Sequence, residues 1–178
     1  KLNDPSRALL GEAQEQWIVD QLTASQQARA TWAVFGNQVL MARIQLPRRD
    51  KLSPITQAAI DKAWPDFSAG MALQVQGLPP ALDSWNGYPA QRSRFYRMLE
   101  ESDANVIVMT GDSHAAWANE LWSDDGRTRV GDEFGVSSVT SLSLADARVQ
   151  SPDIDYVKLM TLAGGEVKWT EPHKRGFT

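Results

Sequence analysis

The sequence predicts an α/β fold, built as a single domain over residues 1–178. Three observations support this. Helical and strand-like patterns alternate along the chain, as in α/β proteins. The run from Asn105 to Thr110 is apolar, rich in β-branched residues and bounded by turn residues, which is typical of a strand buried on both faces. Hydrophobic residues make up 42% and charged residues 22%, which fits one folded, soluble domain of this length.

The first half of the chain contains two predicted helices and one or two strands. Apolar residues at helical spacing predict a helix over Ala8–Leu22. Thr31–Asn37 is a short apolar run that ends in Gly-Asn, which indicates a buried strand leading into a loop. The next segment, Val39–Ile44, fits either a second strand or a loop. Pro54–Trp64 is predicted to be a short helix with Pro54 in its first turn.

The second half is predicted to continue the alternation. Gly77–Pro89 is rich in Gly, Pro, Asp and Asn and is predicted to be an ordered loop. A helix is expected from Pro89 to about Ser102, followed by the strand Asn105–Thr110. Ala115–Trp122 is predicted to be the next helix, and Phe134–Thr140 another strand.

Charge and cysteine content exclude several classes of function. The formal net charge of −4 gives no signature of nucleic-acid binding or of an anionic membrane surface as partner. The absence of cysteine excludes disulfides, thiolate metal ligands and a cysteine nucleophile. No apolar stretch approaches the ~18 residues of a spanning helix, and no signal segment opens the chain.

The segment from Val106 to His114 contains the residues best suited to chemistry. It is a buried strand that runs into a tight turn at Gly111, and α/β proteins place their sites at the carboxyl ends of such strands. Asp112 and His114 are two residues apart, so in an extended loop both would point to one side. A carboxylate and an imidazole there can ligate a metal that activates water and neutralises phosphate charge. The alternative is that Asp112 caps a following helix and that the histidine is structural.

These residues also resemble a known family. TGDSHAAWANEL, residues 110–121, is similar to the Gly-Asp-x-His segment of PhoD-like alkaline phosphatases, a branch of the calcineurin-like metallophosphoesterases. Further segments resemble that family in the same order, and together they cover nearly the whole chain: LLGEAQEQWIVDQL (9–22), TWAVFGNQVLMA (31–42), DSWNGYPAQRSR (83–94, with Asn86 where Asp is usual), EFGVSSVTS (133–141) and VKWTEPHKRGFT (167–178).

The resemblance implies a four-layer α/β/β/α sandwich with a multinuclear metal site between its two sheets. It implies hydrolysis of phosphomonoesters or phosphodiesters, the phosphate ester substrate being attacked by a metal-activated water. Asp112 and His114 match the late metal-binding motif and are the candidate catalytic and metal-ligating residues. Two or more divalent or trivalent ions are expected, with iron and calcium suggested by the resemblance.

Other residues are candidates for substrate contact. Arg92 and Asn37 match positions that contact phosphate or shape the site; the alternatives are a helix-surface charge and a turn residue. Trp85 and Tyr88 are expected to line the cleft or to pack within their loop. Glu133 either supports a metal ligand or is a charge on an edge strand, and we interpret it as the latter.

A metal site of this kind needs more ligands than the chain provides. Only two histidines are present, and His173 lies in a polar context typical of a surface. No Asp-x-His motif occurs upstream of Gly111, and the chain contains no Gly-Asn-His motif. We therefore expect a segment truncated at the N-terminal side, with the missing N-terminal segment supplying most ligands. That segment or another chain is expected to cover exposed apolar sheet surface. The resemblance also suggests an exported protein.

Two other functions fit parts of the sequence. Gly111-Asp112-Ser113 after a strand matches the nucleophile turn of GDS-type serine esterases, with Ser113 as the nucleophile. That motif normally opens its domain, whereas here 110 residues precede it. The second alternative is a non-catalytic binding module on the same fold. Seven Trp residues would then form a recognition surface, although Trp more often belongs to a core.

Overall fold

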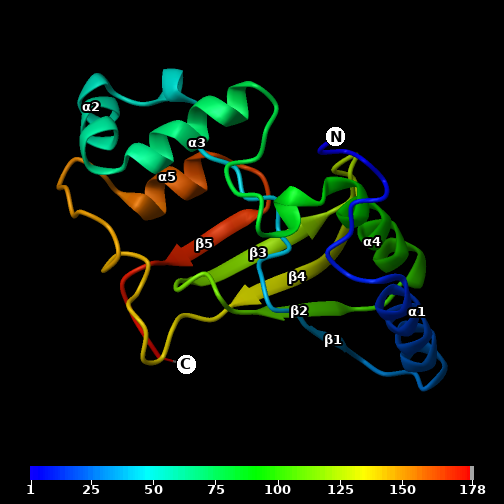
Figure 1. Ribbon diagram of the computed structural model, residues 1–178. Coiled ribbons are helices and arrows are strands. Elements are labelled where there is room, and N and C mark those ends of the chain that lie inside the picture. The colour runs from blue at the N-terminus through cyan, green and yellow to red at the C-terminus, as the bar shows by residue number, and fades with distance from the viewer. Residues whose placement is uncertain (177–178) are drawn as a thin grey trace.

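A mixed five-stranded sheet forms the centre of the molecule (Figure 1), as seen in a computed structural model that describes residues 1–176. The strand order is β1-β2-β4-β3-β5. Strands β1, β2 and β4 are parallel, whereas β3 runs antiparallel to both β4 and β5. The predicted α/β class is therefore confirmed. The strands are β1 (Ala33–Gly36), β2 (Val106–Thr110), β3 (Ala116–Trp122), β4 (Arg129–Gly135) and β5 (Val167–Glu171).

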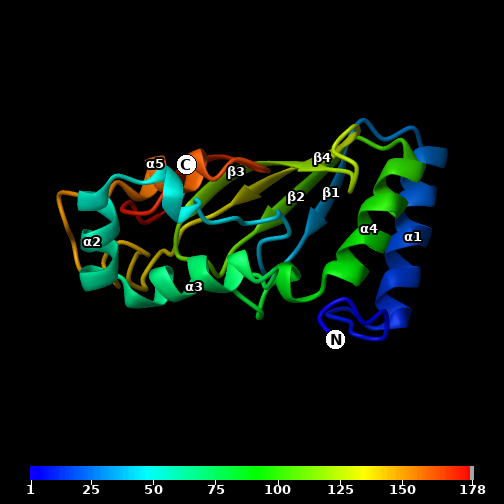
Figure 2. The same ribbon diagram turned by 90° about the horizontal axis from the view of Figure 1, so that it is seen from above.

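The helices gather in two groups. Figure 2 shows α1 and α4 together at one end of the molecule and α2 and α3 at the other. Short 3-10 turns precede α2 and α4. None of the described helices is long and apolar enough to cross a bilayer. The helical elements are α1 (Glu12–Gln27), η1 (Arg49–Lys51), α2 (Pro54–Ala63), α3 (Pro65–Val75), η2 (Trp85–Gly87), α4 (Pro89–Ser102) and α5 (Tyr156–Leu162).

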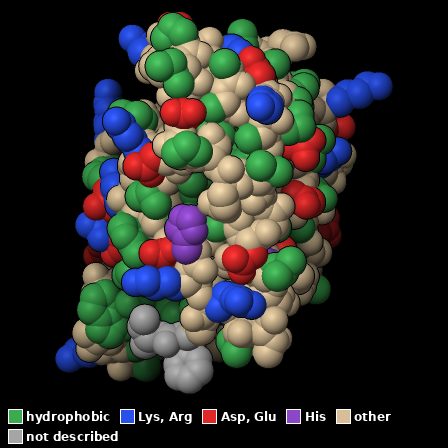
Figure 3. All heavy atoms as spheres, turned by 90° about the vertical axis from the view of Figure 1, so that its left-hand side faces the viewer, with side chains coloured by type: hydrophobic (Ala, Val, Ile, Leu, Met, Phe, Trp, Pro, Cys, Tyr) green, Lys and Arg blue, Asp and Glu red, His purple; other side chains and the backbone are tan. Residues whose placement is uncertain are grey.

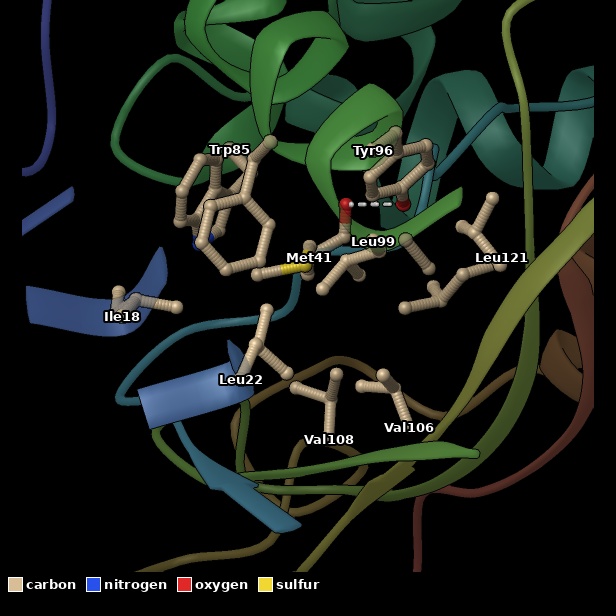
Figure 4. Close-up of a cluster of buried hydrophobic side chains, with 12 residues drawn as sticks. Ile18, Leu22, Met41, Trp85, Tyr96, Leu99, Val106, Val108 and Leu121 are labelled. Carbon is tan, nitrogen blue, oxygen red and sulfur yellow. Dashed lines mark hydrogen bonds between the residues drawn. The ribbon is translucent and has the colours of Figure 1, made fainter. Parts of the chain in front are cut away.

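Each helical group packs its own apolar cluster against the sheet. Under α1 and α4, Trp85, Tyr96 and Val108 are fully buried (Figure 4). The Tyr96 hydroxyl donates a hydrogen bond to the Met41 carbonyl at 3.2 Å, so the one polar atom of this large side chain is satisfied inside the core. A second cluster, centred on α2, α3 and α5, packs against β3 and β5.

The opposite face of the sheet remains open. Met109, Phe134, Ala118 and Trp169 are direct partners across four adjacent strands, so their side chains share one face. Met109 is 40% exposed, Phe134 44% and Trp169 49%. This row, here called the open sheet row, forms an apolar stripe that no described helix covers.

Several predicted elements are confirmed. The helices beginning at Pro54 and Pro89 and the strand before Gly111 are present where the sequence places them. The first helix is shifted: it begins at Glu12, because Gly11 acts as its N-cap and the Leu10 N–H donates to the Gln91 side chain at 3.2 Å. The segment Val39–Ile44 is a loop.

Two predictions were wrong. Ala115–Trp122 is not a helix but contains β3, in which Trp117, Asn119 and Leu121 are buried while their neighbours are less so. Ala, Glu and Leu are strong helix formers, yet pairing with strands on both sides outweighs that preference. The strand predicted over Phe134–Thr140 lies earlier in the chain, because β4 spans Arg129–Gly135. The last two residues of the C-terminal segment that resembles the family, 177 and 178, lie outside the described residues.

Candidate active site

The three parallel strands end at one edge of the sheet, and that edge carries the predicted site. Strand β2 continues into the loop Gly111–Ala115 before β3 begins. The Gly111 N–H donates to the carbonyl of Gln38, just beyond β1, at 3.1 Å. The Val136 N–H, just beyond β4, donates to the Thr110 carbonyl at 2.9 Å. The view of this side in Figure 3 shows a histidine side chain near the middle of the surface, with acidic and basic side chains around it.

The loop holds two residues in the left-handed backbone region. Asp112 has a φ of 64° and His114 a φ of 58°. Each non-glycine residue in this region costs about 1 kcal/mol or more, and such strain persists where the surroundings impose it. The loop is therefore a tight turn, not the extended segment that the sequence suggested. Both side chains are exposed and accessible to solutes.

One hydrogen bond orients the His114 ring. Its Nδ1 atom lies 2.7 Å from the carbonyl oxygen of Leu142. A carbonyl oxygen only accepts, so Nδ1 carries the proton and Nε2 keeps its lone pair. Metal-binding histidines usually have this arrangement, in which the second nitrogen donates to a carbonyl or carboxylate. The tertiary structure thus leaves Nε2 of His114 as the ring nitrogen that could bind a metal.

Ser113 is occupied by structural hydrogen bonds. Its hydroxyl donates to the Ala115 carbonyl at 3.2 Å and accepts from the Trp117 indole N–H at 2.8 Å. Neither histidine is hydrogen-bonded to Ser113 within residues 1–176. A serine nucleophile requires a base within hydrogen-bond reach, so the serine esterase alternative has no support.

Asn37 lies beside the loop, at the end of β1. Its backbone N–H donates to the Met109 carbonyl at 2.9 Å, and its amide nitrogen donates to the Val39 carbonyl at 2.6 Å. The Trp85 indole N–H lies 3.5 Å from the Asn37 side-chain oxygen. Trp85 itself is completely buried and packs on Phe95, so the structure places it in the core beneath Asn37.

Arg92 and Tyr88 form a separate group at the start of α4. The Arg92 side chain is buried and donates to the Asn86 side-chain oxygen at 2.6 Å, which excludes the alternative of a helix-surface charge. Burial lowers the pKa of the Arg92 guanidinium. The Arg7 guanidinium lies over the Tyr88 ring, 5.2 Å from its centroid. Within residues 1–176, no hydrogen bond or ion pair joins Arg92 or Tyr88 to the loop around His114.

Glu133 supports the site from below, a role that the sequence interpretation missed. It lies on β4 in the interior of the sheet and is completely buried, so it is not an edge-strand charge. Its carboxylate accepts from the Met41 N–H at 2.6 Å, the Ala42 N–H at 3.1 Å and the Asn119 side chain at 2.8 Å. Burial raises the pKa of Glu133, while these donors oppose the shift.

Glu166 binds Arg43, the residue that follows Met41 and Ala42 in the segment held by Glu133. It accepts from the Arg43 guanidinium at 2.6 Å and the Trp122 N–H at 2.8 Å, and it shares the single Tyr96 hydroxyl proton, at 3.2 Å, with the Met41 carbonyl. The two carboxylates together fix the chain after β1, which carries Gln38 to its contact with Gly111. For Glu133 the sequence signal is an acidic residue within a strand pattern, whereas Glu166 lies in the turn before β5.

The donor set for a metal is incomplete within the described part of the chain. Residues 1–176 contain no group of three or more His, Asp or Glu side chains placed to hold one ion. Asp112 and His114 are therefore at most part of a ligand set.

Comparison with known proteins identifies the family. The family model described as PhoD-like phosphatase matches residues 1–178. The chain belongs to the PhoD-like phosphatase family. It is 34% identical over 142 residues to alkaline phosphatase D of Bacillus subtilis (strain 168). A solved structure titled as that of PhoD superimposes with a TM-score of 0.61 at 24% identity, which supports the fold.

The chain corresponds to only part of these relatives. The match to alkaline phosphatase D covers 78% of this chain but 19% of that protein. The match to the PhoD structure covers 98% of this chain and 28% of that one. Much of a PhoD-like protein therefore has no counterpart among these residues.

Proposed function

We propose that this chain forms part of the active site of a metal-dependent phosphoesterase that hydrolyses phosphomonoesters or phosphodiesters. The observation that carries the proposal is the His114 ring at the carboxyl end of β2, with Nδ1 donating to Leu142 and Nε2 left as a ligand atom. Family membership supplies the reaction class, and the exposed Asp112 supplies a carboxylate two residues away.

The residues present fit a shared metal site. His114 provides a neutral imidazole nitrogen and Asp112 a carboxylate, which together suit hard or borderline ions such as iron and calcium. A bound ion would lower the pKa of its water and neutralise phosphate charge. His114 and Asp112 would hold such ions, while Gly111, tied to Gln38, fixes the loop. The remaining ligands come from the rest of the protein in this proposal.

The open sheet row supports a second layer in the complete enzyme. We assign it to packing against the remainder of the family's catalytic region, because the chain matches 98% of its own length to only 28% of the solved PhoD chain. Packing there would build the four-layer α/β/β/α sandwich and bury Phe134 and Trp169. Export from the cytoplasm belongs to the same proposal through the family resemblance.

Activity measurements on the full-length protein test the catalytic proposal. His114→Ala and Asp112→Asn should each lower kcat/KM for an aryl phosphate by more than about 100-fold, because even groups that only support a metal ligand contribute 10–100-fold. Metal content should fall in parallel. Asp153→Asn, a matched change at an exposed carboxylate without recorded partners in the described chain, should leave both unchanged. Normal activity and metal content in His114→Ala would refute the proposal, as would equal activity of the 178-residue chain and the full-length protein.

Thiol labelling tests the covered sheet face. The chain has no cysteine, so Phe134→Cys places one thiol on the open sheet row. It should react rapidly in the 178-residue chain and slowly in the full-length protein, with peptide mapping identifying the site. Val75→Cys, at the exposed end of α3, is the comparison position in both proteins. Equal reactivity of the thiol at position 134 in both proteins would contradict the sandwich.

A further inference from the structure

A second feature near the loop has no role in the proposed hydrolysis. It is a small pocket open to solvent, walled by Trp64, Leu144, Arg148, Tyr156 and His173. The Leu144 N–H donates to the carbonyl oxygen of His114 at 2.8 Å. The pocket therefore adjoins the backbone of the candidate active site, although its side chains come from other segments: the α2–α3 junction, the loop between β4 and α5, α5, and the segment after β5.

Arg148 is the most unusual group in this pocket. Its Nε atom is buried and has no hydrogen-bond partner within residues 1–176. No carboxylate in the same residues forms an ion pair with its guanidinium. Asp146, two positions earlier in the chain, instead accepts from the Ser143 N–H and lies 3.7 Å from the Arg175 guanidinium. Buried polar groups are nearly always paired with protein, water or a ligand. The guanidinium of Arg148 is therefore free of protein acceptors within the described residues and can bind an added anion.

The pocket holds the guanidinium in place. Arg148 lies over the Trp64 ring, 5.3 Å from its centroid, and Trp64 is anchored by an indole N–H bond of 2.8 Å to the Val149 carbonyl. Tyr156 meets the Trp64 ring edge-on at 5.9 Å. Stacking on an aromatic face fixes the planar fork of an arginine and lowers the entropy lost when it binds an anion.

Two of the side chains that line the pocket, Arg148 and Tyr156, offer hydrogen-bond donors. Burial raises the pKa of Tyr156 to about 12, so its hydroxyl stays protonated at neutral pH and donates. The pocket volume is about 30 Å³, enough for a water-sized group such as one oxygen of an anion.

We infer that the pocket between Trp64, Arg148 and Tyr156 is an oxyanion subsite that binds a phosphate group. Guanidinium groups recognise phosphate oxygens through paired, charge-assisted hydrogen bonds. The choice of phosphate among oxyanions rests on the proposed function. The ligand is either free inorganic phosphate or a second phosphate on the alcohol portion of the ester.

Titration of the 178-residue chain with inorganic phosphate tests the subsite without any hydrolysis. The probe is the Trp64 indole N–H signal in ¹H–¹⁵N spectra, assigned by its loss in Trp64→Phe, with the metal chelated and ionic strength held constant by chloride. We expect a saturable shift. Arg148→Gln should weaken phosphate binding by about tenfold or more, and Tyr156→Phe by a smaller factor. Arg127→Gln, on the exposed β3–β4 turn, should match the wild type.

A linear titration, or the same affinity in Arg148→Gln, would overturn the inference. Arg148→Lys keeps the charge but removes the Nε–H, so it provides a second comparison if the glutamine variant folds poorly. Because the readout is binding to a metal-free chain, the subsite can stand if hydrolysis is disproved, and the reverse also holds.

Kinetics of the full-length protein identify the source of the phosphate. If it is part of the substrate, Arg148→Gln raises KM for an ester with a second phosphate but not for a simple aryl phosphate. If it is free phosphate, both KM values stay unchanged while the phosphate titration is lost.

Discussion

The Nδ1 atom of His114 lies 2.7 Å from the carbonyl oxygen of Leu142, a residue 28 positions further along the chain. This contact crosses from the β2–β3 loop to the segment after β4 and determines which ring nitrogen is available. The same segment is held by a second bond, from the Leu144 N–H to the His114 carbonyl. Ring and backbone of His114 are thus positioned by one stretch of tertiary structure.

The first prediction concerns the tautomer of this ring. Long-range ¹H–¹⁵N spectra at about pH 8.5, well above the usual imidazole pKa, should show His114 with its proton on Nδ1. His173, whose ring has no recorded hydrogen bond in the described residues, should show a mixture of tautomers. A proton fixed on Nε2 of His114 would contradict its assignment as a metal ligand through that atom.

The second prediction separates the metal enzyme from a serine esterase. Ser113→Ala removes the acceptor of the Trp117 indole N–H but no proposed ligand. Stability should fall by about 1 kcal/mol, the usual contribution of one hydrogen bond, as measured by urea unfolding. Phosphatase activity of the full-length protein should stay within a few-fold of the wild type. Loss of activity comparable to that of His114→Ala would instead favour a nucleophilic serine.

The third prediction tests the support beneath the site. In Glu133→Gln, one carboxylate oxygen becomes an NH₂ group that faces the Met41 N–H, the Ala42 N–H or the Asn119 amide. At least one buried donor then lacks an acceptor, so the free energy of unfolding at pH 7 should fall by about 1–3 kcal/mol. Glu100→Gln, on the surface of α4, is the matched control and should change little. Equal stability of both variants would show that the hydrogen bonds accepted by Glu133 do not stabilise the fold.

The fourth prediction is a pH dependence. Hydrogen bonds from Arg49 and Ser68 lower the pKa of Asp61 from 3.8 to about 2. A carboxyl whose pKa is lower in the folded state stabilises the protein above its unfolded pKa and loses this contribution as the pH falls through the folded value. Asp61→Asn should therefore reduce the acid sensitivity of unfolding between about pH 4 and 2, followed by circular dichroism. Asp153→Asn should leave that pH profile unchanged.

The sequence by itself determined the parts of the fold with strong local signals. The apolar, β-branched residues of β2 favour a strand with one face buried under the helices. Pro89 begins α4 because proline suits the first turn of a helix. The motif from Gly111 to His114 located the candidate site at the end of β2, and together with the other segments in the same order it indicated the family. These are properties of short, contiguous segments.

Only the tertiary structure decided the remaining features, because they depend on partners distant in sequence. Ala116–Trp122 has helix-forming residues yet is a strand, since β4 and β5 satisfy its backbone on both sides. Glu133 holds the segment after β1 because the Met41 and Ala42 N–H groups donate to its buried carboxylate. His114 presents Nε2 because the chain near Leu142 returns to accept from Nδ1, and no local pattern encodes that return.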